Sequence, residues 1–357
     1  DAQLVLAGPS ETSLAAVTIH ISSGFEVNDQ LIFTNTADIT SSYNPATGIL
    51  SLSGTASLDI WQSALQRIQY KSNSLTPGLA TRTITFTISD NSTTLTATKE
   101  ISMTYIPVIS VPAQHILYVK KNASGNQTGS DWDHAIPELA TALKWAHENK
   151  GRDLWNASNP LKIYVAKGLY KPMYSAADNN FGQDDGRKNT FLLVKDVELY
   201  GGFDPENGIR ERTDTRIFDE QNGTILSGDF NENDVVTGSG GTLTFLNNEE
   251  NAYNVLVGSN ELGVASVDGF TVQKGYANAE NSYSIVNEKY VYHYYGAGIT
   301  ISYSSPLLQN IHVKENKTIG NGGGIFLGTS NAKLDNIDVH HNEAVDGGGI
   351  DISYSST

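Results

Sequence analysis

Cysteine is absent from the 357 residues of this chain. Its absence excludes a disulfide framework and any metal site built on thiolates. Basic residues are scarce, because 23 Lys and Arg stand against 39 Asp and Glu, which gives a formal net charge of −16 at pH 7. An acidic surface of this kind repels phosphate backbones and anionic lipid headgroups. We therefore expect no nucleic-acid partner.

Long apolar runs are also absent, since no stretch approaches the roughly 18 residues of a membrane-spanning helix. Direct membrane insertion is therefore not expected. Met is rare, with two residues, whereas Gly is abundant, with 33, and this composition is typical of a turn-rich β protein. The chain begins without Met and ends inside a repeated phrase. We interpret it as a truncated segment that further repeats of the same parent chain would extend.

The last hundred residues contain an internal repeat. The phrases GAGITI, GGGIFL and GGGIDI recur, and their third glycines, Gly298, Gly324 and Gly349, are 26 and 25 residues apart. Apolar residues alternate within each phrase, as they do in a strand that buries one face. Each repeat is therefore predicted to consist of short strands joined by turns.

Superimposing the repeats aligns their apolar residues in columns. These columns are Ile299 with Ile325 and Ile350, Ile301 with Leu327 and Ile352, and Leu308 with Leu334. Such columns form a continuous core when coils of the chain stack about 4.8 Å apart, so the pattern predicts a parallel β-helix. A leucine-rich repeat is the competing architecture, but its return segment is a helix or a loose turn. Here the return is rich in glycine and β-branched residues, which disfavour a helix.

Two asparagines, Asn316 and Asn342, occupy equivalent corners of the repeat. Asn side chains tolerate left-handed turns and can bond to backbone groups of neighbouring coils. We expect them to form a structural ladder together with Gly298, Gly324 and Gly349, which we interpret as turn residues. No helix or lysine follows these glycines in a way that would suit a phosphate site.

An ordered set of motifs precedes the repeat. It comprises ILYVKKNASGNQTGSDWDHAIPELATAL, IYVAKGLYKP, FLLVKDVELYGGF, TILSGDFNEND, NAYNVLVG and VDGFTVQKG. The set resembles secreted bacterial right-handed parallel β-helix proteins, related in fold to pectate lyases and in repeat style to polymorphic outer-membrane proteins. The resemblance implies a right-handed β-helix over 115–357, with clear coils from about residue 262. The segment at about 136–149 has the spacing of an amphipathic helix, which would cap the first coil.

The first 106 residues have a different pattern. Three segments alternate apolar and polar residues between turn signals: VTIHI (17–21), ILSLSG (49–54) and TITFTIS (83–89). The alternation is typical of a β-sandwich, and LDIWQSALQRI (58–68) is predicted to be a helical connection that carries a core Trp61. GFEVNDQLIF, YNPATGILSLSGTAS, WQSALQRIQY and RTITFTISDN resemble the cadherin-like repeats of very large bacterial surface proteins. We therefore expect a cadherin-like or Ig-like sandwich over 1–106 and a proline-containing linker at 107–114.

Calcium is the one cofactor that the sequence suggests. The resemblance to cadherin-like modules implies calcium at a domain junction, but the DxNDN linker is missing here, which leaves Asp90 and Asn91 as the only junction candidates. A second candidate, DFNEND, reproduces the first half of an EF-hand loop but lacks its sixth-position Gly and twelfth-position Glu. Its residues are Asp229, Asn231, Asn233 and Asp234. A solvated turn is the alternative interpretation of this segment.

One coil carries about 15 extra residues, since FTVQKG and IHVKEN are 41 residues apart where 26 is the rule. The insertion, YANAENSYSIVNEKYVYHYY (276–295), is rich in tyrosine. The candidate ligand-binding residues are Tyr283, Tyr290, Tyr292, Tyr294 and Tyr295. Aromatic faces with hydroxyls suit sugar rings or protein partners. The alternative, which we favour, is an extra strand pair packed on the flank of the coils.

Catalysis is disfavoured by the residues that face outward. The outward columns are Thr300 with Phe326 and Asp351, His312 with Asp338, and Lys314 with His340. None stacks two carboxylates, and no Arg that could act as a lyase base follows Arg216. His340 and His341 are adjacent on a predicted strand, so we expect them to face opposite sides. No catalytic residue is assigned.

The sequence thus predicts an all-β protein that combines a sandwich with a β-helix. This combination resembles the cell-surface adhesins that gliding bacteria export through type IX secretion. The resemblance implies an extracellular location at the bacterial cell surface and a structural or adhesive role, with surfaces, glycans or surface proteins as partners. Two alternatives from other classes stay open. They are a polysaccharide lyase or glycoside hydrolase of the β-helix type, and a carbohydrate-binding module.

Overall fold

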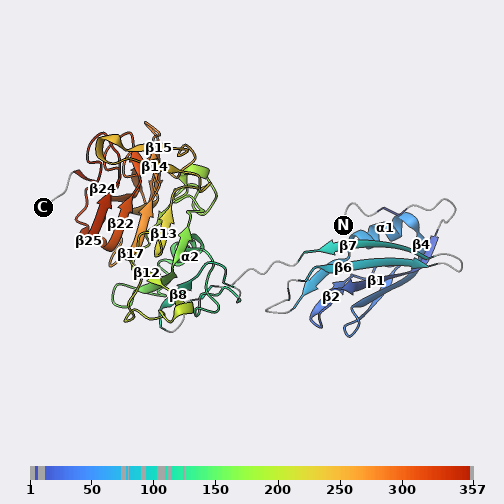
Figure 1. The fold of residues 1–357 in the computed structure, drawn as a ribbon. Helices are drawn as coiled ribbons and strands as arrows, with labels where there is room; N and C mark the ends of the chain where they lie inside the picture. Colours follow the sequence, from blue (N-terminus) through green and yellow to red (C-terminus); the bar gives the residue numbers. More distant parts are fainter. Residues whose placement is uncertain are drawn as a thin grey trace. The chain divides into compact units, whose positions relative to one another are not determined.

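The computed structural model describes residues 5–6, 13–73, 78, 80–89, 94–102, 109–110, 114–123 and 125–353. The chain divides into two compact units, Asp1–Ile106 (unit 1) and Pro107–Thr357 (unit 2). Strands predominate in both, and the described residues contain two α-helices, so the protein is all-β (Figure 1). Most of the predicted linker at 107–114 and the calcium candidates Asp90 and Asn91 lie outside the described residues.

Unit 1 contains a five-stranded antiparallel sheet, in the order β3-β4-β1-β6-β7, and the pair β2-β5. Its elements are β1 Ser13–Ser23, β2 Asp29–Ile32, β3 Thr40–Asn44, β4 Ile49–Ser57, α1 Leu58–Gln66, β5 Gln69–Ser72, β6 Arg82–Ser89 and β7 Thr94–Ile101. The three segments with alternating residues form β1, β4 and β6, as predicted. Helix α1 lies within the predicted connection and carries Trp61, which is fully buried and donates from Nε1 to the Leu14 carbonyl at 2.9 Å.

A buried ion pair lies in the core of unit 1. Arg82 donates from Nε to Asp29 Oδ2 at 2.8 Å, and both side chains are fully buried. Tyr70 donates to the other oxygen of Asp29 at 2.7 Å. Burial acts to raise the pKa of Asp29, but these hydrogen bonds outweigh it and lower the pKa below its usual value. The carboxylate is therefore held charged in the core, where it depends on its partners.

Unit 2 is built on two sheets of parallel strands. The first contains β8 Ile116–Val119, β9 Leu161–Ala166, β10 Gly168–Tyr170, β12 Val197–Phe203, β13 Thr224–Ser227, β17 Ser266–Gln273, β22 Leu307–Lys314 and β25 Lys333–His340. The second contains β11 Phe191–Leu192, β16 Leu256–Ser259, β21 Ile299–Ser302, β24 Ile325–Gly328 and β26 Ile350–Ser353. A short parallel pair joins β18 Tyr276–Ala277 to β23 Lys317–Thr318. Figure 1 shows β8, β12, β17, β22 and β25 following one another across the first sheet.

Strand register in unit 2 confirms the predicted columns. Ile299 pairs with Ile325, and Ile325 pairs with Ile350. The columns that contain Ile301 and Leu308 pair in the same way. The side chains of Ile299 and Ile325 are fully buried in the core between the two sheets, whereas Ile350 and Ile352 in the last strand are exposed.

Helix α2, Leu139–Asn149, contacts β8 and β11, the first strands of the two sheets. It begins three residues later than the predicted start at about 136. The reason is that Ile136 pairs with Val119 as a strand residue, its backbone N–H bonding to Tyr118 at 2.8 Å. Pro137 also disfavours a helical conformation at the residue before it. Leu139 and Leu143 are buried in the core that the columns extend.

We call each repeat of unit 2, which contributes one strand to each of the two sheets, a pass of the chain. The two corner asparagines connect neighbouring passes. Asn316 is fully buried, and its amide oxygen accepts a hydrogen bond from the Gly275 backbone N–H at 2.9 Å. Its amide nitrogen donates to the backbone carbonyls of Val272 and Lys314 and to the side-chain oxygen of Asn342. Asn342 accepts from the Asn316 backbone at 3.0 Å and donates to the Val313 carbonyl at 2.8 Å. Each side chain therefore satisfies backbone groups of the adjoining pass.

The glycines of the repeated phrases have two different roles. The first glycine of each phrase has a positive φ of about 60° and makes the left-handed turn. The third glycines, interpreted from sequence as turn residues, do not have positive φ. A Cβ on Gly298 would lie 2.7 Å from the Asn316 amide and 2.6 Å from the Gly324 carbonyl. Gly298 and Gly324 are therefore required by the close approach of an asparagine and the next pass, whereas a Cβ on Gly349 would meet only Val339, at 3.4 Å.

We predict that Asn316→Ala destabilises unit 2 by about 2 to 4 kcal/mol, because it leaves several buried backbone groups without partners. Thermal unfolding followed by circular dichroism measures the effect. Asn331→Ala is the matched control, since Asn331 is exposed, and should change stability by less than about 0.5 kcal/mol. Equal effects of the two substitutions would contradict a structural role for the ladder.

Candidate functional site

The tyrosine-rich insertion forms a β-hairpin. Strands β19 Tyr283–Val286 and β20 Lys289–Tyr292 pair antiparallel, with Tyr283 opposite Tyr292. The two-residue turn consists of Asn287 and Glu288, which both have positive φ, as a type I′ turn requires. The insertion is therefore an ordered strand pair.

The inner face of this hairpin packs on unit 2. Val286 and Val291 are buried against Ala176, Leu192 and Val257. Asp178 accepts from the backbone N–H groups of both turn residues at 2.8 Å. Because apolar contacts and hydrogen bonds both hold the hairpin, it is a fixed part of the flank, in agreement with the interpretation favoured from sequence.

The outer face of the hairpin carries exposed tyrosines. Tyr283, Tyr290 and Tyr292 are 49%, 51% and 37% exposed. The rings of Tyr283 and Tyr290 are 4.9 Å apart edge to face, and those of Tyr290 and Tyr292 are 6.2 Å apart and nearly parallel. Aromatic faces and hydroxyls are thus presented together to solvent.

Half-buried rings continue this surface along the chain. Tyr292 contacts Tyr294 at 5.4 Å, Tyr294 contacts Tyr295 at 4.3 Å, and Tyr295 stacks on Phe326 at 5.0 Å. We name the set formed by Tyr283, Tyr290, Tyr292, Tyr294, Tyr295 and Phe326 the aromatic strip. The structure therefore brings all five predicted tyrosines together and adds Phe326. The register pairing β21 with β24 places this ring beside them.

A buried histidine supports the base of the hairpin. His293 is 3% exposed and lies within hydrogen-bonding distance of the Ser282 and Ser284 hydroxyls, at 2.9 and 3.0 Å. Burial lowers the pKa of His293 to about 4, so the ring is neutral at physiological pH. It stacks on Tyr253, whose ring in turn lies 4.2 Å from the Arg187 guanidinium carbon.

A surface cleft of about 270 Å³ lies beside the hairpin turn. Its lining includes His147 and Lys150 from the end of α2, Glu288 from the turn, and Lys195 with Glu261. Lys195 and Glu261 form an ion pair at 2.9 Å. The cleft therefore offers charges of both signs and polar groups next to the hairpin.

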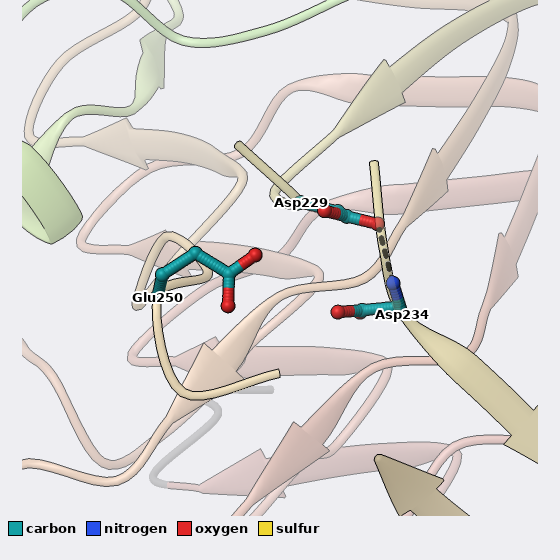
Figure 2. Close-up of side chains that lie close together, drawn as sticks. All are labelled: Asp229, Asp234 and Glu250. Carbon is teal, nitrogen blue, oxygen red and sulfur yellow. Dashed lines mark hydrogen bonds between the residues drawn. The ribbon is translucent and has the colours of Figure 1, made fainter. Parts of the chain in front are cut away.

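A cluster of three carboxylates lies on a second excursion of the chain. Asp229 follows β13, Asp234 precedes β14 Val235–Thr237, and Glu250 lies beyond β15 Thr244–Leu246, which pairs with β14. One oxygen from each carboxylate lies within 4.8 Å of the others. Figure 2 shows the three carboxylates turned toward a common space. Asp234 donates from its backbone N–H to Asp229 Oδ2 at 3.2 Å.

The members of this carboxylate cluster titrate differently. Burial raises the pKa of Asp229, but hydrogen bonds from the Asp234 backbone and Lys274 outweigh it and lower the pKa overall. The Lys274 ammonium lies 3.1 Å from Asp229 Oδ2. Burial raises the pKa of Asp234 to about 6, with further contributions from the charges of Asp229 and Glu250. Of Asp229 and Asp234, it is therefore Asp234 whose charge the folded protein tolerates less.

The predicted metal residues are only partly brought together. Asp229 and Asp234 lie in the cluster, Asn233 donates from its backbone to Asp229 at 3.3 Å, and Asn231 is exposed. Sequence reasoning missed Glu250, which the β14–β15 hairpin folds back toward Asp229. The only sign of Glu250 in the sequence was the acidic and amide composition of NNEENAYN, a segment that the whole hairpin separates from DFNEND.

The expectation that His340 and His341 face opposite sides is wrong. Their Nδ1 atoms lie 2.6 Å apart. Strand β25 ends at His340, and His341 has a φ of 51°, so the alternation of a strand does not extend to it. His340 Nε2 also lies 3.1 Å from Glu220, which contacts Lys314 at 3.4 Å. Glu220 therefore joins the partly buried His340 to the buried Lys314 beside the first sheet.

Comparisons with known proteins give little beyond one short match. No protein-family model matches the chain, and no solved structure matches it. Halomucin of Haloquadratum walsbyi is 36% identical over 76 residues, which cover 20% of this chain and 1% of that protein. The chain therefore spans a very small part of the relative it matches. Within the described residues, no helix has the length and apolar character needed to cross a bilayer.

We predict that Asp234→Asn changes the pH dependence of stability in metal-free buffer. The folded pKa of Asp234, about 6, lies above the ordinary aspartate pKa of 3.8, so its contribution to stability falls as pH rises between these values. Asparagine keeps an acceptor for neighbouring donors and carries no charge. The variant should therefore have the higher melting temperature above pH 6, with the difference vanishing near pH 4.

Melting temperatures of wild type and variant between pH 4 and pH 8 test this prediction. Asp346→Asn is the control, because Asp346 is exposed and lies outside the cluster, and this substitution should change the melting temperature little. Parallel pH profiles for wild type and Asp234→Asn would show that Asp234 does not titrate as the cluster geometry indicates.

Proposed function

We propose that this chain is an extracellular adhesive segment of a large bacterial surface protein. In this proposal unit 1 is a cadherin-like β-sandwich, and unit 2 is a right-handed parallel β-helix capped by α2. The segment would hold a binding face away from the cell and attach it to surfaces, glycans or other cells. The observation that carries the proposal is the aromatic strip, which a rigid strand pair presents to solvent.

The strand pairing supports this architecture. Successive repeats of unit 2 alternate between the two parallel sheets, from β21 to β22 and from β24 to β25. In unit 1 both sheets contribute to one buried core around Trp61. The match to halomucin supports membership in a very long protein, because 76 residues amount to 1% of that relative. The acidic composition agrees with an exposed, soluble surface.

The chemistry of the aromatic strip supports binding of glycans. Tyrosine rings provide flat apolar faces for the C–H groups of sugars, and their hydroxyls provide hydrogen bonds at the rim. Three of the rings are more than a third exposed although they contact one another. The inner face of the hairpin is fixed by Val286 and Val291, so little conformational entropy is lost when a ligand binds.

We predict that the chain binds glycans on an array and that the double substitution Tyr290→Ala and Tyr292→Ala weakens binding at least about tenfold, since roughly 1.4 kcal/mol corresponds to that factor. The control is Tyr303→Ala. Tyr303 is 50% exposed, as the strip tyrosines are, but it lies outside the aromatic strip. Circular dichroism would confirm that each variant is folded. Unchanged binding by the double variant, or equal loss with Tyr303→Ala, would contradict a role for the strip.

A second candidate function, a polysaccharide lyase or hydrolase of the β-helix type, has one observation in its favour. The carboxylate cluster places Lys274 at 3.1 Å from Asp229, with Asp234 and Glu250 close by. A metal-bound uronate and a lysine base would use such a set. Release of unsaturated products from acidic polysaccharides, followed by absorbance, tests it. Turnover that Lys274→Met abolishes would favour the enzyme over the adhesin.

A further inference from the structure

We propose that Asp229, Asp234, Glu250 and Asn251 form a binding site for one calcium ion. This ion would tie the β14–β15 hairpin to the end of β13. The site differs from the EF-hand-like candidate in the sequence, because two of its four ligands, Glu250 and Asn251, follow the β14–β15 hairpin. It is also independent of glycan binding by the aromatic strip.

The geometry of the carboxylates fits a single ion of this size. Oxygens of Asp229, Asp234 and Glu250 lie within 4.8 Å of one another, and calcium binds oxygen at about 2.3 to 2.6 Å in flexible arrangements. Two ligands on opposite sides of one ion are thus separated by about this distance. The carboxylates point toward the same space from two segments of the chain (Figure 2).

Unpartnered oxygens at the cluster are the second observation. Asn251 is 1% exposed, and its amide donates to Asp234 Oδ2 at 2.6 Å, so this side chain is directed into the cluster. The amide oxygen of Asn251 has no hydrogen-bond partner, and neither has Asp234 Oδ1, although both atoms are buried. Buried oxygens without donors are costly, and a cation would satisfy both.

Asn233 lies beside Glu250 at the edge of the cluster and holds its carboxylate in place. With its amide nitrogen toward Glu250 Oε1, it donates at 3.0 Å there and at 3.2 Å to the Asn247 carbonyl. The site thus combines carboxylate and amide oxygens, which are the ligands that calcium takes.

The charge of the cluster also favours a divalent cation. Three carboxylates are offset by Lys274 alone among the described residues that form ion pairs with them. The cluster therefore retains two negative charges, which one calcium ion would balance. Magnesium demands near-ideal octahedral geometry and dehydrates reluctantly, and zinc prefers nitrogen and sulfur ligands, which the cluster does not contain.

Isothermal titration of the metal-free full chain with CaCl₂ tests the proposal. We expect about one ion per chain with a dissociation constant of about 10⁻⁵ to 10⁻³ M. Asp234→Asn and Glu250→Gln should each weaken binding at least about tenfold, which corresponds to about 1.4 kcal/mol. Lys274→Met should tighten binding, because it removes the competing positive charge. An effect in this direction cannot result from loss of folding.

The control is Asp346→Asn, which should bind as wild type does because Asp346 lies outside the cluster. Hydrogen exchange should show slower exchange in residues 229–251 on addition of calcium. The proposal is overturned if no heat is observed up to about 10 mM calcium, well above the range of extracellular sites. It is also overturned if the doubly substituted chain, Asp234→Asn with Glu250→Gln, binds calcium as tightly as wild type does.

Discussion

In-register pairing of successive parallel strands is the constraint on which the rest of unit 2 depends. A shift by one residue between β22 and β25 would turn the buried columns outward. Asn316 and Asn342 hold the register at the corner, because their side chains bond to backbone groups of the neighbouring pass. The inward-facing residues of the two sheets are thus committed to packing, and the largest departures from the repeat lie in segments that leave the sheets.

Two such segments interrupt the same connection in consecutive passes. Residues 228–255 lie between β13 and β16, and residues 274–298 lie between β17 and β21. Because β13 pairs with β17 and β16 pairs with β21, stacking brings the two excursions next to each other. The first carries the carboxylate cluster and the second carries the tyrosines of the aromatic strip. Their proximity is a consequence of the repeat and requires no further contact to explain it.

Much of the fold could be predicted because its signals are local or periodic. Alternation identified β1, β4 and β6, and the 26-residue period placed Ile299, Ile325 and Ile350 in one column. The period could not show which residues an excursion folds back on, so Glu250 and Asn251 were missed. The close approach that requires Gly298, and the pairing of Ile136 with Val119 before α2, depend on contacts with distant residues. Those contacts leave no mark on the local pattern.

Arg187 explains how both excursions are held to one support. Its Nε donates to the Asn251 carbonyl at 2.7 Å, and its Nη2 donates to the Tyr276 carbonyl at 2.8 Å. The guanidinium also stacks on Tyr253, which packs against His293 at the base of the tyrosine hairpin. The geometry of a binding site is maintained when hydrogen bonds and packing from neighbouring side chains hold the residues that form it. One arginine therefore bonds to the backbone of both excursions, next to the hydrogen bond that joins them directly from the Tyr276 N–H to the Ala252 carbonyl at 2.8 Å.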